Sequence, residues 1–184
     1  LCVPILTDPT TSATTGKPRA TNREVYEQVL SDMNTAISLL EGKSRKHCSH
    51  IDYYVAYGIM TRIALYMEDR QAAYNAASKA ISGSKTLTAD ILNGYNDADA
   101  KDVLWGAEII EAQGTTNPQF LAHMDIAFGG YGEAARKCCS EWLYKKIHVG
   151  DARMKWWNYE NLNANGNTKV GYQQYKFRFA DPSN

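Results

Sequence analysis

The clearest hydrophobic pattern in the chain runs from residue 22 to residue 41, where apolar side chains recur at three- and four-residue steps. This spacing places them on one face of an α-helix. Thr21 and Glu24 stand in the positions of a capping box, in which each side chain accepts a hydrogen bond from the other residue's backbone N–H, and Gly42 is a helix-stop signal. The pattern predicts a helix whose apolar face carries Val25, Tyr26, Val29, Leu30, Met33, Ala36, Ile37 and Leu40.

Two more helical patterns follow, over residues 52–67 and 70–82. A start signal at Ser49 to Asp52 precedes the first, and a short polar break separates it from the second. The second pattern carries small residues at Ala73, Ala77 and Ala80, which would let the two helices approach closely. We therefore expect an antiparallel helical hairpin, the packing unit of tetratricopeptide repeats.

The rest of the chain has weaker periodicity. Residues 1–20 are rich in Pro and Thr and predict an extended lead-in, whereas residues 103–110 are a short apolar run compatible with a buried strand. Residues 133–147 predict a helix, and residues 172–179 a final short strand. We expect one domain over residues 1–184, made of the lead-in (1–20), a helical repeat region (21–83) and a loop-rich, ligand-binding region (84–184). The predicted fold class is mainly α, with tetratricopeptide-like hairpins, long irregular loops and a few short strands.

Composition narrows the classes of function. The chain has 184 residues, 44% of them hydrophobic, which is enough for a folded core. Lys and Arg together number 20, and so do Asp and Glu. The chain therefore has no net positive charge to attract nucleic acid, which is not expected as a partner. Tyr and Trp, at 12 and 4, outnumber the 4 Phe, which favours rings with a polar edge that suit half-wet surfaces. No run of 18 apolar residues predicts a membrane-spanning helix.

Several stretches resemble the SusD/RagB family in their order and spacing along the chain. A proline-bearing approach to a capped helix is followed by an "i-x-D-L-x-x-A"-like helix, an "A-R-v-y-L-y"-like helix, an "A-x-x-A"-like helix, an "E-v-i-f"-like segment, a "D-x-R" turn and a "y-K-y/f" segment. The corresponding stretches here are Cys2 to Leu6 with Lys17 to Tyr26, Val29 to Ile37, Thr61 to Met67, Ala73 to Ala77, Asp102 to Trp105, Asp151 to Arg153, and Tyr175 to Phe177.

The resemblance implies a non-catalytic, cell-surface protein that binds an oligosaccharide and delivers it to a TonB-dependent, SusC-like outer-membrane transporter for nutrient uptake. It also implies a location on the extracellular face of the outer membrane, through a lipid anchor on the full-length protein. Cys2 does not match the lipidated cysteine, because it lies where the family has a mid-chain "G-V-P" segment. We therefore expect the chain to be an internal fragment of a SusD-like protein.

Trp156, Trp157 and Tyr159 are the first candidates for ligand binding. They lie in a polar segment rich in Asn, beside Lys155. The polarised C–H face of a sugar ring stacks on an indole, and sugar hydroxyls seek amide partners, so this composition suits a glycan. In a strand the two Trp side chains would point to opposite faces, so only one is expected to meet a ligand while the other packs inward. The alternative is that these rings anchor a loop.

Phe128 and Tyr131 flank the glycine pair of a loop and are the second candidates. The loop lacks the Lys-Ser/Thr ending of a phosphate-binding loop, so no nucleotide is expected. Two interpretations of this loop are left open: it contacts the glycan, or it is an ordinary turn with a buried Phe.

Residues 47–52 contain His47, Cys48, His50 and Asp52, which are ligand types for zinc. No second cluster follows to complete a tetrahedral site, so we interpret the segment as a helix-start loop and expect neither metal nor cofactor. The other cysteines are Cys2 and the adjacent pair Cys138 and Cys139; the pair is placed on the predicted helix and assigned to core packing or one long-range disulfide.

Six carboxyl groups are candidate glycosidase acids: Glu108, Glu111, Asp125, Glu133, Glu141 and Asp151. A glycosidase needs two carboxyls placed across a sugar, and the sequence places no such pair. Asp151 with Arg153 instead suggests a turn-fixing pair. The function expected first is glycan binding without catalysis; the alternatives are a tetratricopeptide-like adaptor for protein partners and a helical glycoside hydrolase.

Overall fold

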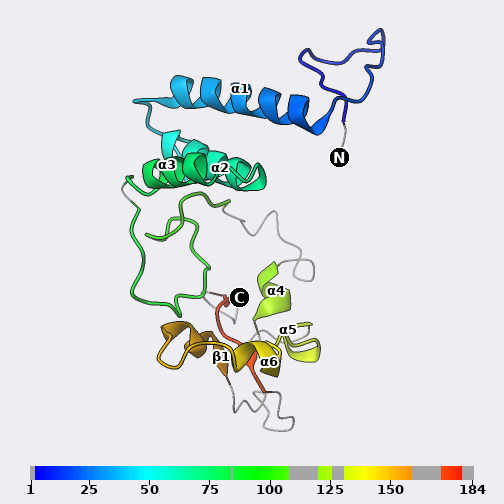
Figure 1. Ribbon diagram of the computed structural model, residues 1–184. Helices are drawn as coiled ribbons and strands as arrows, with labels where there is room; N and C mark the ends of the chain where they lie inside the picture. Colours follow the sequence, from blue (N-terminus) through cyan, green and yellow to red (C-terminus); the bar gives the residue numbers. More distant parts are fainter. Residues whose placement is uncertain (1–2, 84, 108–119, 126–130, 159–170, 180–184) are drawn as a thin grey trace. The chain divides into compact units, whose positions relative to one another are not determined.

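The chain folds into two compact units, Leu1–Lys85 and Thr86–Asn184, in the computed structural model (Figure 1). The structure describes residues 3–83, 85–107, 120–125, 131–158 and 171–179. In these ranges the first unit holds the long helices, and the second holds short helices and a two-stranded ladder. The expectation of a mainly α fold with few short strands is confirmed. None of the described helices is both long and apolar enough to span a membrane.

The first helix, α1, spans Asn22–Leu40 and has the predicted capping box. The backbone N–H of Glu24 donates to Thr21 Oγ1 at 3.3 Å, and the N–H of Thr21 donates to Glu24 Oε2 at 2.7 Å. Because the second bond favours the ionised carboxylate, it lowers the pKa of Glu24. Beyond the helix, Gly42 has a φ of +70°, the left-handed conformation that ends many helices and that glycine adopts at low cost.

Burial on α1 is concentrated near its C-terminal end. Ile37 is buried, whereas the other members of the predicted apolar face are half-buried. Leu39 is 63% exposed. Most of the apolar stripe of α1 therefore keeps some area in contact with solvent.

The predicted helical hairpin is confirmed as α2 (Tyr53–Tyr66) and α3 (Arg70–Ala80), which pack against each other. Its buried residues are Val55, Ala56 and Ala64 from α2, and Ala73, Ala76 and Ala80 from α3. The predicted contact residue Ala77 is only half-buried, and Ala76 takes the buried place instead. The helix is thus rotated slightly from the face that the alanine spacing suggested.

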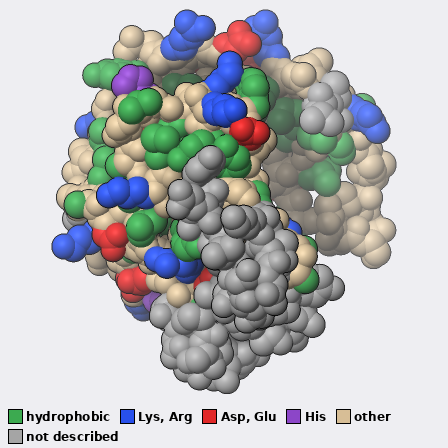
Figure 2. Space-filling model, turned by 90° about the horizontal axis from the view of Figure 1, so that it is seen from below, with side chains coloured by type: hydrophobic (Ala, Val, Ile, Leu, Met, Phe, Trp, Pro, Cys, Tyr) green, Lys and Arg blue, Asp and Glu red, His purple; other side chains and the backbone are tan. Residues whose placement is uncertain are grey.

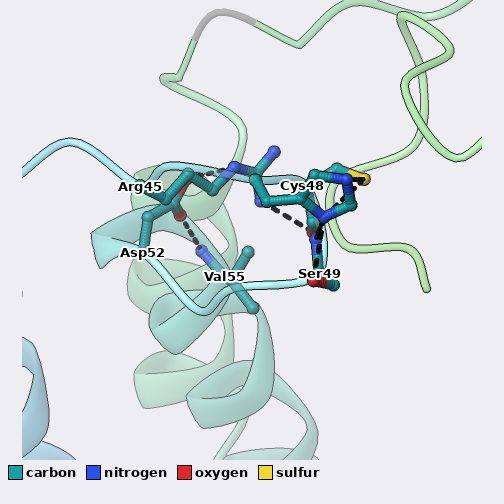
Figure 3. Close-up of polar contacts among 6 residues, drawn as sticks. Arg45, Cys48, Ser49, Asp52 and Val55 are labelled. Atoms are coloured by element: carbon teal, nitrogen blue, oxygen red, sulfur yellow. Dashed lines mark hydrogen bonds and ion pairs between the residues drawn. The ribbon is translucent and has the colours of Figure 1, made fainter. Parts of the chain in front are cut away.

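The loop before α2 is a polar turn (Figure 3). Asp52 caps α2 by accepting from the N–H of Val55 at 2.9 Å, and its other oxygen lies 3.3 Å from Arg45 Nε. Arg45 also donates to the carbonyl of Cys48 at 3.5 Å. The interpretation of residues 47–52 as a helix-start loop is confirmed, with Asp52 and not Ser49 as the capping residue.

The second unit is made of short elements. In chain order they are α4 (Phe120–Met124), α5 (Tyr131–Ala134), α6 (Glu141–Tyr144), the 3-10 helix η2 (Ala152–Trp156), β1 (Trp157–Asn158) and β2 (Gln173–Gln174). The strands pair antiparallel, with Trp157 opposite Gln174. Both glutamines of β2 are buried, so this unit is organised partly around polar side chains.

The prediction of one helix over residues 133–147 is wrong. Between α5 and α6 the backbone pairs with β2 and with the residue before it: the N–H of Cys139 donates to the Tyr172 carbonyl at 2.9 Å, and the N–H of Gln174 donates to the Lys137 carbonyl at 3.0 Å. These long-range bonds replace helical ones, and Ser140 then caps α6. Cys138 and Cys139 therefore lie in an extended segment; both are free thiols, and Cys139 is buried.

The strand expected at residues 103–110 is absent from its described part, residues 103–107, which turns instead. The N–H of Val103 donates to the carbonyl of Ala100 at 3.0 Å, a turn bond that an extended strand does not make. Residues 108–110 lie outside the described residues. The final strand predicted over 172–179 is limited to Gln173–Gln174.

Candidate functional site

Of the five predicted site residues, Trp156 and Trp157 are fully described. Phe128 and Tyr159 lie outside the described residues. Tyr131 begins α5, but its side chain is also outside the part that the structure describes. The surroundings of the two tryptophans therefore define the candidate site.

Trp156 ends η2 and is held at its polar edge. Its indole Nε1 donates to the carbonyl of Ile91 at 2.5 Å, and its own carbonyl accepts from the N–H of Tyr175 at 2.7 Å. The side chain is half-buried. The ring is thus fixed in orientation while part of it remains accessible, and it joins the loop around residue 91 to the segment after β2.

Lys176 lies against Trp156 and two other rings. Its Nζ is 4.4 Å from the ring centre of Trp156, 4.9 Å from that of Tyr95 and 5.0 Å from that of Phe177. An ammonium at these distances is attracted by the negative ring faces. Phe177 also packs edge-on against Phe120, with the ring centres 5.0 Å apart. We call Tyr95, Phe120, Trp156, Lys176 and Phe177 the aromatic cluster.

Tyr95 is brought to the cluster by a loop tied to the residues after Lys176. The backbone N–H of Arg178 donates to the Gly94 carbonyl at 2.9 Å, and Asn96 Nδ2 donates to the backbone carbonyl of Arg178 at 3.0 Å. Gly94 and Tyr95 have φ values of +86° and +51°. A tyrosine rarely adopts the left-handed conformation, and residues held in such conformations concentrate at binding sites.

The buried Gln174 fixes the other side of the cluster. Its Oε1 accepts from the N–H of Phe177 at 2.9 Å, and its Nε2 donates to the carbonyls of Phe177 and Met124. Because Met124 ends α4, this one amide connects β2, the backbone of Phe177 and the helix that carries Phe120. The ring arrangement is therefore held by hydrogen bonds as well as by packing.

The cluster remains open to solvent. Tyr95 is 40% exposed and Phe120 is 56% exposed, while Trp156, Lys176 and Phe177 are half-buried. Exposed ring faces beside a polar group suit a ligand with apolar faces and polar edges. Such a surface can bind and orient a ligand.

Trp157 lies next to this surface but belongs to the ladder. It begins β1, pairs with Gln174 and is half-buried. The ring contacts described above involve Trp156. That only one of the two indoles contacts a ligand is still a prediction.

Sequence reasoning missed Tyr95, Phe120, Lys176 and Phe177 as site residues. The "y-K-y/f"-like segment at Tyr175 to Phe177 contains two of these residues, but in the sequence it indicates only the family resemblance. Tyr95 and Phe120 carry no signal of their own, since they reach the cluster through tertiary contacts.

Three of the six candidate glycosidase acids have structural roles. Asp125 is buried and accepts from the N–H of Phe179 at 2.7 Å. Glu141 pairs with Lys145 at 2.7 Å, which lowers its pKa. Asp151 accepts from Arg153, which lowers the pKa of Asp151 to about 2 and confirms the turn-fixing pair. Both contacts favour the ionised form of the carboxylate.

Glu108, Glu111 and the side chain of Glu133 lie outside the described residues. Within the described ranges, no three His, Cys, Asp or Glu side chains gather as metal ligands. An open groove lies between the lead-in and α1, but its wall carries charged side chains such as Lys17, Arg19, Glu24 and Glu27 in place of aromatic rings. The aromatic cluster therefore has more of the chemistry of a sugar site than this groove.

No family model matches the chain, and no curated protein does. Among solved structures, the chain is similar to a SusD-like carbohydrate binding protein from Bacteroides vulgatus, with a TM-score of 0.74 and 24% sequence identity. The similarity covers 99% of this chain and 39% of that one, so the chain spans well under half the length of its structural neighbour. Over nearly its whole length, this chain has the fold of a SusD-like protein.

Proposed function

We propose that this chain is part of a SusD-like glycan-binding protein and that the aromatic cluster contributes to its oligosaccharide site. The similarity of fold to a carbohydrate binding protein over 99% of the chain is the observation that carries the proposal. The sequence resemblance supports it independently, because it rests on motif order along the chain.

The site binds the glycan non-covalently and catalyses no reaction. The accessible faces of Tyr95, Phe120 and Trp156 stack on sugar C–H faces, while neighbouring polar groups take hydroxyls. No bond of the sugar is broken. In the cell, the protein holds its glycan on the outer face of the outer membrane, through a lipid anchor, and passes it to a SusC-like transporter, as the family resemblance implies.

The test is a glycan-array screen followed by calorimetry on the protein and on Trp156→Ala and Trp157→Ala. Loss of a stacked indole removes about 1–3 kcal/mol by analogy with other flat ligands, a drop in affinity of about tenfold or more. Only one of the two variants is expected to show this loss. Trp156→Phe is the matched control, since it keeps a ring but loses the hydrogen bond to Ile91.

Circular dichroism must confirm that each variant folds. If both folded alanine variants bind like the parent, the indoles are not part of the site; Tyr95 and Phe120 of the cluster, and then Phe128 and Tyr131, become the next candidates. Release of reducing sugar from the bound glycan would instead identify a glycoside hydrolase. Binding of peptides and of no glycan would favour the adaptor.

A further inference from the structure

The charge of Lys176 bears on which glycans the cluster would accept. Lys176 is half-buried, and three aromatic rings surround its ammonium. The ion pairs within the described residues join Arg45 to Asp52, Lys145 to Glu141 and Arg153 to Asp151, and none includes Lys176. The rings attract this cation but do not neutralise it.

A partly desolvated charge without a counter-ion favours a ligand that supplies one. The nearby Arg178 is also a cation, and its guanidinium is oriented by a hydrogen bond to the carbonyl of Leu92 at 3.1 Å, which leaves its charge in place. An anion arriving at the cluster would therefore meet the ammonium of Lys176 between exposed ring faces.

We propose that the site selects acidic oligosaccharides, whose sugar units carry a carboxylate or a sulfate ester. This inference rests on the proposed glycan-binding function and specifies its ligand class. A sugar unit stacks on Tyr95 or Phe120, the two most exposed rings of the cluster, and its anionic group pairs with Lys176 Nζ. A neutral sugar in the same place leaves the ammonium without a counter-ion, so it binds more weakly.

Calorimetry with matched ligand pairs tests this. The pairs are an oligogalacturonate with its methyl ester, and a sulfated galactan oligosaccharide with its desulfated form. We expect the charged member of at least one pair to bind about tenfold or more tightly, the effect of one charge-assisted contact, and which pair responds identifies the anionic group. The affinity should fall as NaCl is raised.

Variants assign the effect to one residue. Lys176→Met keeps an unbranched apolar chain and is expected to lose the preference, whereas Lys176→Arg retains it. Lys155→Met is the matched control, because Lys155 is an exposed lysine of η2 in the same unit. The side-chain ammonium signal of Lys176 in NMR spectra of the unmodified protein should shift on addition of the preferred acidic ligand, which gives a readout that needs no variant.

The outcomes separate the two proposals. If glycans bind with equal affinity in charged and neutral forms, or if folded Lys176→Met keeps the preference, the charge selection is wrong and glycan binding stands. If no glycan binds, both proposals are wrong. Binding of an acidic peptide in place of any glycan would likewise overturn both.

Discussion

At the level of single residues, the indole N–H that could bind a sugar hydroxyl instead holds Trp156 in place within the protein. The indole N–H of Trp156 is used by the carbonyl of Ile91, so the ring offers its accessible faces, and not its donor, to a ligand. Lys176 occupies part of that ring surface. Tyr95 and Phe120 therefore offer more open stacking area than the indole that first suggested the site.

The contacts of Asp151 determine how its contribution to stability depends on pH. Arg153 lies 2.6 Å from it and holds its pKa at about 2, below the ordinary 3.8. A lowered folded-state pKa adds stability that is present above pH 3.8 and is lost as the pH falls toward 2. NMR titration of the Asp151 carboxyl is expected to give this low value.

Arg153→Gln should move the pKa of Asp151 back up toward 3.8, because the guanidinium is the main cause of its lowering. Lys155→Gln, in the same 3-10 helix, serves as the control and should leave it unchanged. A pKa near 3.8 in the parent would contradict the ion pair.

At the level of elements, close packing in the first unit depends on small side chains. Ala73, Ala76 and Ala80 are buried where α3 meets its neighbours, while the half-buried Ala77 lies at the margin. Small residues let helix backbones approach, and such a contact has little room for added volume.

Ala76→Leu should lower the free energy of unfolding by about 1–3 kcal/mol, because three added carbons must enter a packed contact. Ala77→Leu should cost less, as its side chain is half-buried. Ala72→Leu is the control, since Ala72 is exposed on the same helix. Chemical denaturation measures all three; equal midpoints for parent and Ala76→Leu would contradict the observed pairing of α2 and α3.

At the level of the whole molecule, large apolar side chains remain in contact with solvent in both units. The most exposed are Tyr66, Tyr74, Ile81, Leu87, Trp142 and Val149. On the face seen in Figure 2, hydrophobic side chains reach the surface between charged and neutral ones. The half-buried stripe of α1 adds further apolar area in contact with solvent.

We therefore expect the 184-residue chain, studied by itself, to bind a hydrophobic dye and to self-associate as its concentration rises. Light scattering and dye fluorescence check this. Leu39→Lys and Ile81→Lys, which change exposed residues of the first unit, should weaken both signals. A monodisperse monomer that binds no dye would contradict the expectation.

The sequence by itself determined the elements that depend on local physics. The capping box of Thr21 and Glu24, the helical spacing through Leu40 and the left-handed stop at Gly42 all lie within a few residues of one another, so α1 could be predicted closely. The same holds for the α2–α3 hairpin and for the Asp151–Arg153 turn. The family-like order of motifs also anticipated the fold.

Only the tertiary structure decided the rest. Residues 136–140 are not helical, because the backbones of Lys137 and Cys139 hydrogen-bond to Gln174 of β2 and to Tyr172, which overrides a local helical pattern. The aromatic cluster joins Tyr95, Phe120, Trp156, Lys176 and Phe177 from separate loops and short elements. Trp156 could be singled out by its neighbours in sequence, but its partners could not, because the hydrogen bonds of Gln174 and Arg178 that assemble them act between distant segments.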